Sequence, residues 1–321
     1  MAVKELSSGR GDFAGAEGVQ EISARVAATA GPGVEECWME IEGARMRYLR
    51  AGSGPALILL HGLLGYSFSW RFTMPALAPY ATVYAPDMLG SGFSDRGYGL
   101  DYGMRACARR VVRFAEHLCL SFVDLLGTSH GGGVALMAAD EFLAAGSRVK
   151  LNSLVLVAPV NPFSSHGKRL APFLGTPLGA TLFRLTFPRM PFLFPYAHRR
   201  MYGNRNNIPP GTLEGYMAPL AIPGLFEHGL KIVRTWTQDL EELEATLPKL
   251  ARVPILLLWG ADDPAVYASS ARRLAQFFHN PQTIIFPGVG HLPYEECPEE
   301  FNRALIEFLM RTRVPAQPGF S

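Results

Sequence analysis

Short apolar runs recur along the chain and alternate with segments of helical periodicity. Residues 36–41 and 46–51 alternate apolar and polar positions around Glu42-Gly43, as the two strands of a β-hairpin do. The later runs are mostly continuous, which is typical of strands buried on both faces of a parallel sheet. They are residues 56–60, 82–85, 121–126, 154–158, 255–259 and 283–286.

Helical spacing fills several of the gaps between these runs. Apolar residues recur at helical intervals from Met104 to Leu118, residues 132–139 have the composition of a buried helix, and Pro298 opens a last helix. Strands that alternate with helices favour an α/β fold with a doubly wound, mostly parallel sheet, here of about eight strands.

Residues 161–247 interrupt this alternation. The segment is rich in Pro, Phe, Leu and Arg, shows no strand pattern, and is too long for a structureless loop in a compact domain. We therefore expect a helical cap at 161–247, inserted into an α/β core of residues 36–160 and 248–321. Residues 1–35 are expected to form an N-terminal tail that is loose or holds a short helix.

Aromatic and leucine side chains give the expected cap much apolar surface. They are Phe173, Leu182, Phe183, Phe187, Phe192, Phe194 and Tyr196. Two interpretations hold together, packing of the cap onto the core and lining of a hydrophobic substrate pocket, and the sequence does not sort the residues between them. A third interpretation is a membrane-surface patch that uses Arg184, Arg189, Arg199 and Arg200.

Composition narrows the classes of function. The 321 residues are 48% hydrophobic and 18% charged, which is typical of a globular protein with a sizeable core. A net charge of +2 gives no indication of a nucleic-acid partner. The sequence shows neither an apolar run long enough for a membrane span nor a secretory signal pattern. We therefore expect a cytoplasmic protein that acts on a small molecule, with a homodimer left open.

The cysteines give no framework of disulfides or metal ligands. Four are present, and none forms a C-x-x-C motif. We interpret them as reduced thiols, and we expect neither a metal nor another cofactor. They are Cys37, Cys107, Cys119 and Cys297.

Gly127-Thr128-Ser129-His130-Gly131 is the most informative motif of the chain. It follows a predicted strand and precedes a predicted helix, which is the context that a nucleophile elbow requires. The glycines on either side of Ser129 leave room for a strained turn. The alternative is a tight turn with an ordinary serine, and the context favours Ser129 as a nucleophile.

A serine nucleophile needs a neighbouring base, and a histidine base needs a carboxylate that orients it. Among the eight histidines, His291 lies directly after the last predicted strand, at the sheet edge where Ser129 is expected. Asp262 and Asp263 follow the preceding strand at the same edge, and one of them is the expected carboxylate. The other loop that could supply an acid, after residue 158, has none close to the strand.

Acyl transfer also needs donors for the developing oxyanion. We assign this role to the backbone N–H groups of His130, which follows the nucleophile, and of Leu63, in the loop after an early strand. Both are backbone roles, and the ring of His130 has no assigned function.

Four loops carry motifs at spacings that match one known family. They are HGLLG at 61–65, D-x-x-G-x-G-x-S at 87–95, WGADD at 259–263 and GHLPYEECP at 290–298. From about residue 36 to residue 310 the chain thereby resembles the α/β-hydrolase family, in its capped branch. The resemblance implies an oxyanion loop, a structural loop, an acid turn and a histidine loop, in that order. It also implies Asp263 as the acid, because the family's acid stands three residues after the glycine.

Departures from related subclasses narrow the expected reaction. Haloalkane dehalogenases and epoxide hydrolases of this family use an aspartate nucleophile, which Ser129 argues against, and Leu292 stands where carbon–carbon bond hydrolases often carry Trp. We therefore expect a carboxylic-ester hydrolase with the triad Ser129, Asp263 and His291, acting through an acyl-enzyme on hydrophobic medium-chain or aromatic esters. The alternatives are a carbon–carbon bond hydrolase, a perhydrolase and a non-catalytic ligand receptor.

Overall fold

One sheet of eight strands organises the chain, in the order β1-β2-β4-β3-β5-β6-β7-β8. The computed structural model describes residues 16–97, 99–164, 170–186 and 192–313. β1 pairs with β2 and β2 with β4 in antiparallel register, and the pairings from β4 across to β8 are parallel. The predicted α/β fold is confirmed. The strands are β1 Val34–Ile41, β2 Ala44–Ala51, β3 Ala56–Leu60, β4 Thr82–Pro86, β5 Phe122–Thr128, β6 Lys150–Val157, β7 Ile255–Gly260 and β8 Gln282–Phe286.

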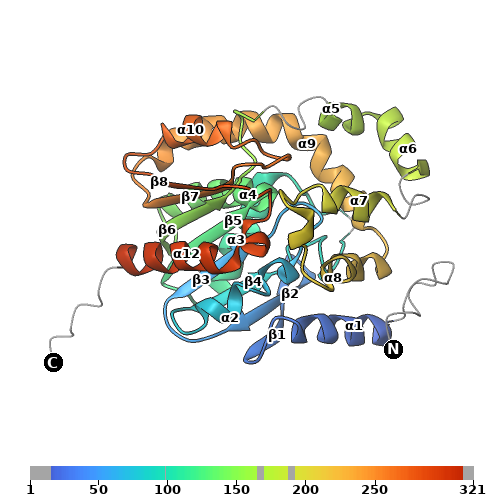
Figure 1. Ribbon diagram of the computed structural model, residues 1–321, viewed down its shortest axis with the longest axis horizontal. Helices are drawn as coiled ribbons and strands as arrows, with labels where there is room; N and C mark the ends of the chain where they lie inside the picture. Colours follow the sequence, from blue (N-terminus) through green and yellow to red (C-terminus); the bar gives the residue numbers. More distant parts are fainter. Residues whose placement is uncertain (1–15, 98, 165–169, 187–191, 314–321) are drawn as a thin grey trace.

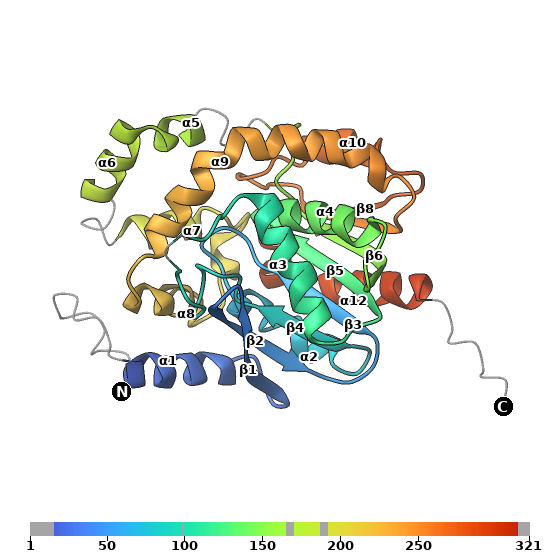
Figure 2. The same ribbon diagram turned by 180° about the vertical axis from the view of Figure 1, so that it is seen from behind.

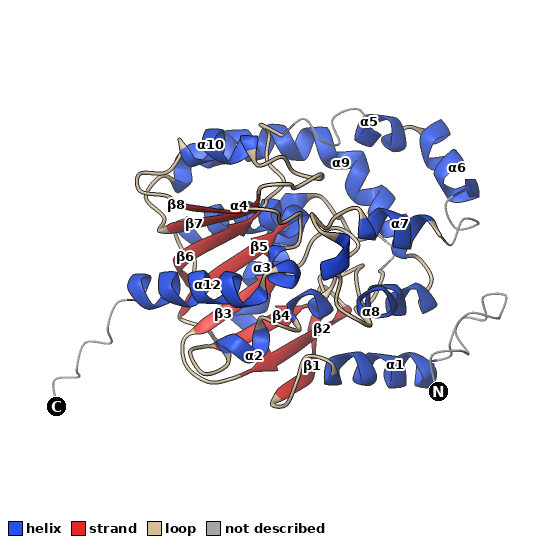
Figure 3. Cartoon of the chain, in the orientation of Figure 1, coloured by secondary structure: helices blue, strands red, loops and turns tan. Residues whose placement is uncertain are grey.

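Helices cover both faces of the sheet (Figure 3). Ile58 and Leu60 of β3 pack in one hydrophobic core, and Leu57 and Leu59 pack in a second core on the other face. This division follows from the strand itself, in which successive side chains point to opposite faces. The first core is covered by α3 Met104–His117, α4 Ser129–Leu143 and α10 Ser269–Ala275, and the second by α2 Met74–Leu77 and α12 Pro298–Thr312.

The described part of the segment between β6 and β7 contains five helices. They are α5 Leu170–Gly175, α6 Pro177–Thr186, α7 Leu193–Arg199, α8 Thr212–Met217 and α9 Leu225–Thr246. Figures 1 and 2 show α5 to α8 gathered at one end of the molecule, whereas α9 runs back to α3 and α4. The described part of the insertion contains no strand. Phe187 and Arg189, which belong to the predicted apolar and cationic sets, lie outside the described residues.

The remaining described elements are short. They are α11 Pro293–Glu296 and the 3-10 turns Ser67–Trp70, Arg205–Asn207, Ala218–Ala221 and Leu247–Leu250.

The described part of the chain has no helix that is long and apolar enough to cross a membrane.

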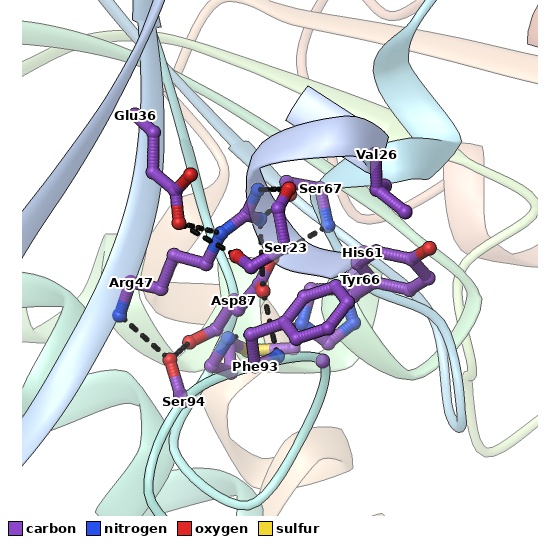
Figure 4. Close-up of polar contacts among 12 residues, drawn as sticks. Ser23, Val26, Glu36, Arg47, His61, Tyr66, Ser67, Asp87, Phe93 and Ser94 are labelled. Atoms are coloured by element: carbon purple, nitrogen blue, oxygen red, sulfur yellow. Dashed lines mark hydrogen bonds and ion pairs between the residues drawn. The ribbon is translucent and has the colours of Figure 1, made fainter. Parts of the chain in front are cut away.

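The N-terminal segment contains an ordered helix, α1 Ala16–Ala28, where a loose tail or a short helix was expected. Arg47 of β2 is fully buried and donates hydrogen bonds to Glu36, at 2.9 Å, and to the carbonyl of Ser23 in α1, at 3.3 Å. The same guanidinium reaches Asp87 at 3.1 Å (Figure 4). A charged group this deeply buried is stable only when it is paired, so α1 is held against the core through Arg47.

Candidate active site

Ser129 lies at a strained turn between β5 and α4. Its φ is +52°, in the left-handed region that non-glycine residues rarely adopt. A Cβ added at Gly127 would come within 2.2 Å of the carbonyl oxygen of Gly131, and one at Gly131 within 2.3 Å of the carbonyl of His61. Only glycine permits this close approach, so the local sequence builds the turn that presents Ser129.

Asp263 and His291 are in direct contact. The Oδ2 atom of Asp263 lies 2.7 Å from Nδ1 of His291, and both side chains are buried. Oδ1 of Asp263 accepts hydrogen bonds from the backbone N–H groups of Ala265, at 2.7 Å, and Val266, at 2.9 Å. Because an ionised carboxylate only accepts, Nδ1 of His291 carries the proton, and Nε2 is left as the acceptor. Asp262, the other candidate acid, is exposed.

The loop after β3 lies against Ser129. A Cβ added at Gly62 would stand 3.2 Å from Cβ and 3.8 Å from Oγ of Ser129. His61 is fully buried; its Nδ1 donates to the carbonyl of Gly62 at 2.9 Å, and its Nε2 accepts from the N–H of Met88 at 3.0 Å. His61 thereby holds the loop that carries Leu63.

Two backbone N–H groups near Ser129, one at the start of α4 and one in the loop after β3, are the expected oxyanion donors. His130 is the second residue of α4, and the first N–H groups of a helix have no intrahelical partner. Neither the N–H of His130 nor that of Leu63 donates a hydrogen bond to another described residue. The structure therefore leaves both expected oxyanion donors unused beside Ser129.

A cavity of about 430 Å³ contains both Ser129 and His291 in its wall. About half of the other lining residues lie on the inserted helices, and most of those are apolar. They include Leu174, Phe183, Phe194, Leu230, Val233, Trp236 and Leu240. The structure thus sorts the aromatic residues of the insertion: Phe183 and Phe194 line the cavity, whereas Phe173, Phe192 and Tyr196 are exposed.

Two histidines at the site stay neutral at physiological pH. His130 is buried under α9, its ring stacks on Trp236 with centroids 6.4 Å apart, and burial lowers its pKa to about 4. His198 lines the cavity, and burial lowers its pKa to about 4 as well. Desolvation disfavours the imidazolium in both cases. Neither ring is arranged as His291 is, with a carboxylate on one nitrogen.

Glu295 anchors the histidine loop and was not singled out by sequence. It is fully buried and pairs with Arg71, which follows the turn Ser67–Trp70. It also accepts hydrogen bonds from the hydroxyls of Tyr202 and Tyr216 in the insertion, each at 2.5 Å. Burial and the Glu295 carboxylate raise the pKa of both tyrosines, which keeps them as donors. No local sequence pattern predicts these contacts, because the partners of Glu295 are 79 to 224 residues away from it in the sequence.

The insertion is also fastened to the histidine loop through its backbone. The N–H of His291 donates to the carbonyl of Met201 at 2.7 Å. Glu296 accepts from the N–H groups of Gly290, at 2.7 Å, and Gly203, at 2.9 Å. The position of His291 therefore depends on the segment that follows α7.

No metal centre is found among the residues that the structure describes: no three His, Cys, Asp or Glu side chains converge there as ligands. The four cysteines, all within the described residues, form no disulfide.

Comparison with known proteins identifies the family. Residues 57–304 match the Alpha/beta hydrolase family. An uncharacterized protein of Mycobacterium tuberculosis is 28% identical over 288 residues, which cover 86% of this chain and 81% of that protein. The N-formylmaleamate deformylase of Pseudomonas putida is 40% identical over 131 residues, which cover 40% of this chain and 46% of the deformylase. The crystal structure of the haloalkane dehalogenase DatA from Agrobacterium tumefaciens superposes with a TM-score of 0.76 at 20% identity, covering 89% of this chain and 99% of that one. The chain therefore belongs to the α/β-hydrolase family and is a hydrolase.

Proposed function

We propose that this hydrolase cleaves carboxylic esters through an acyl-enzyme on Ser129. One observation carries the proposal: the wall of a single apolar cavity contains a strained serine and a histidine whose far nitrogen bonds a buried carboxylate. A serine hydroxyl becomes a useful nucleophile only beside such a base, and the base needs the carboxylate to fix its tautomer.

The reaction then proceeds in two halves. Oγ of Ser129 attacks the ester carbonyl while Nε2 of His291 takes its proton, and the tetrahedral oxyanion accepts hydrogen bonds from the N–H groups of Leu63 and His130. The C–O bond to the alcohol breaks, and His291 returns the proton to the leaving alkoxide. A water that His291 deprotonates attacks the acyl-enzyme, and collapse of the second tetrahedral adduct frees the acid and restores Ser129. Asp263 stabilises the imidazolium in both halves.

The cavity supports the proposed class of substrate. A volume of about 430 Å³ with mostly apolar walls suits a medium-chain or aromatic ester. We assign residues 161–247 as the cap that supplies those walls, and the reaction needs no cofactor. The same serine chemistry would act on the alternatives, a carbon–carbon bond substrate or a peracid-forming reaction. The similarity to N-formylmaleamate deformylase makes an N-formyl amide a second candidate substrate.

The test is hydrolysis of p-nitrophenyl esters of graded acyl length, with N-formyl amides measured in parallel. Ser129→Ala should lower kcat/KM by about 10⁴-fold or more, since the acyl-enzyme can no longer form. Ser121→Ala is the matched control. Ser121 is exposed and precedes the first residue of β5, whereas Ser129 follows the last residue of the same strand. Wild-type turnover that survives in Ser129→Ala would contradict the proposal. A folded wild type without ester turnover would also contradict it and favour the deformylase, the carbon–carbon bond hydrolase or the receptor.

A further inference from the structure

The first half of the insertion is unusually basic. Between residues 161 and 213 the sequence contains no Asp or Glu, although the whole chain has 28 acidic residues against 30 Lys and Arg. The same stretch contains seven of those Lys and Arg residues, so the rest of the chain has more acidic than basic side chains. The seven are Lys168, Arg169, Arg184, Arg189, Arg199, Arg200 and Arg205.

The helices of this stretch have apolar side chains on both faces. Phe183 of α6 and Phe194 of α7 line the cavity that holds Ser129. On the outer side, Leu178 and Leu182 of α6 are 65% and 45% exposed, and they stand one turn apart on one helix face. Phe192, the N-cap residue of α7, and Tyr196 in α7 repeat this spacing, with 61% and 54% of their surface exposed. A helix with apolar residues on both faces is normally buried on both faces. The exposed outer face of α6 and α7 therefore indicates a binding surface.

Three arginines lie next to this outer face. A groove of about 460 Å³ between α7 and residues 205–214 is lined by Arg199, Arg200, Arg205 and also by Tyr196. None of the ion pairs among the described residues involves these arginines, and Glu214 is the one acidic side chain in the described wall of the groove. Tyr196 belongs to both features, so the cationic groove continues the apolar face.

We propose that this surface docks on an anionic lipid bilayer. The docking surface consists of Leu178 and Leu182 on α6, Phe192 and Tyr196 at the start of α7 and within it, and the arginine groove. Figures 1 and 2 place α6 and α7 at the same end of the molecule. Apolar side chains next to arginines are the combination that binds the interface of anionic membranes: the apolar groups enter the acyl boundary and the guanidinium groups pair with headgroup phosphates.

The charge of the surface favours a bilayer over a second copy of the chain. A two-fold dimer through this face would bring the cluster of Arg199, Arg200 and Arg205 against or beside its own copy, and like charges at an interface are repulsive. An anionic lipid surface supplies the opposite charge without ordering a second protein. Arg184, which lies on the same helix as Leu182, is already paired with Glu227 and is left out of the proposal.

Docking would place α6 and α7, which form part of the cavity wall, against the lipid bilayer, where hydrophobic esters concentrate. α6 and α7 would face lipid with their outer side chains and the cavity with Phe183 and Phe194. This consequence rests on the proposed ester hydrolysis, whereas the docking itself does not. Vesicle binding is therefore measured separately from ester turnover. A negative result for one proposal then does not affect the test of the other.

The experiment is co-sedimentation of the full chain with phosphatidylcholine vesicles, with and without about 30% phosphatidylglycerol, in about 0.1 M salt. We expect binding to the anionic vesicles and much weaker binding to the neutral ones. The triple variant Arg199→Gln, Arg200→Gln, Arg205→Gln should lower the partition coefficient by about 100-fold, at roughly fivefold for each arginine near the surface. Raising the salt concentration should also lower the partition coefficient of the wild type, because salt screens the attraction between the arginines and the anionic lipids.

A second variant tests the apolar part. Leu178→Ser with Leu182→Ser should also weaken vesicle binding, whereas Leu143→Ser, at an equally exposed leucine at the end of α4, should not. None of these residues lines the cavity, so kcat/KM for a short, water-soluble ester should stay within about twofold of wild type in every variant. Normal activity would also show that the variants are folded.

Three results would overturn the proposal. The first is wild type that ignores anionic vesicles, and the second is binding that both variants retain in full. The third is a dimer in size-exclusion chromatography with light scattering that the leucine variant breaks while vesicle binding is absent, which would assign the surface to a second copy of the chain.

Discussion

Replacing Glu295 by Gln should destabilise the protein far more than the loss of an ordinary ion pair does. The Glu295 carboxylate is fully buried and accepts four hydrogen bonds. Two come from Arg71, at 2.8 and 3.0 Å, and two from the hydroxyls of Tyr202 and Tyr216. In Glu295→Gln one acceptor oxygen becomes an NH₂ donor that faces other donors. The guanidinium of Arg71, only 5% exposed, then has no compensating charge.

The magnitude follows from this burial. Removal of one partner from a buried ion pair costs about 3–5 kcal/mol, because the other charge stays desolvated. The same change at an exposed pair costs about 1 kcal/mol or less. Arg50 and Glu35 form such a pair, at 3.5 Å and with side chains 47% and 66% exposed, so Glu35→Gln is the matched control.

The assay is urea unfolding at neutral pH, followed by tryptophan fluorescence and by circular dichroism. We expect the free energy of unfolding to fall by about 4 kcal/mol in Glu295→Gln and by less than about 1 kcal/mol in Glu35→Gln. Equal, small losses in the two variants would refute the reasoning, since they would mean that water or rearrangement compensates Arg71.

Three further predictions concern single residues. Asp263→Asn should lower kcat/KM by about 10⁴-fold, because the amide favours the wrong histidine tautomer, whereas the exposed Asp262→Asn should stay within about twofold; the reverse order would show that the acid is wrongly assigned. The pKa of His130 is lowered from 6.5 to about 4, so the unfolded chain binds its proton first, and His130 should contribute a fall of about 3 kcal/mol in the free energy of unfolding as the pH drops from 6.5 towards 4. His130→Gln should remove this contribution in urea titrations across that range and leave the similar contribution of His198, and an unchanged slope would contradict the buried neutral ring. Gly127→Ala should abolish activity or folding, since its Cβ would lie 2.2 Å from a carbonyl oxygen, while Gly175→Ala, with 3.6 Å to its nearest neighbour, should behave as wild type in activity and melting measurements.

Sequence patterns predict most of the fold because strand periodicity is local. Each of the eight expected strands is found, with ends that differ by a few residues. The expected helix at 132–139 is longer and begins at Ser129. Gly131, Gly132 and Gly133 have low helix propensity and hide the first turn, which tertiary packing stabilises nonetheless.

The polar network that supports the site could not be predicted in the same way. Pairing of Arg71 with Glu295 joins segments 224 residues apart, and neither residue has a local signature. The cavity-lining and exposed aromatic residues of the insertion also look alike in sequence. Only the orientation of α6 and α7 separates Phe183 and Phe194 from Phe192. Contacts of this kind depend on how short helices pack, which periodicity alone does not fix.

The most direct test of the account is covalent trapping of the nucleophile. The protein is treated with a p-nitrophenyl alkylphosphonate, and release of p-nitrophenolate, intact mass and peptide mass are measured for wild type and Ser129→Ala. We predict one phosphonyl group per wild-type chain, on the peptide that contains Ser129, and no adduct on the variant. An adduct on another residue, equal labelling of the variant, or a folded wild type that stays unmodified would contradict the assignment of Ser129 as the nucleophile.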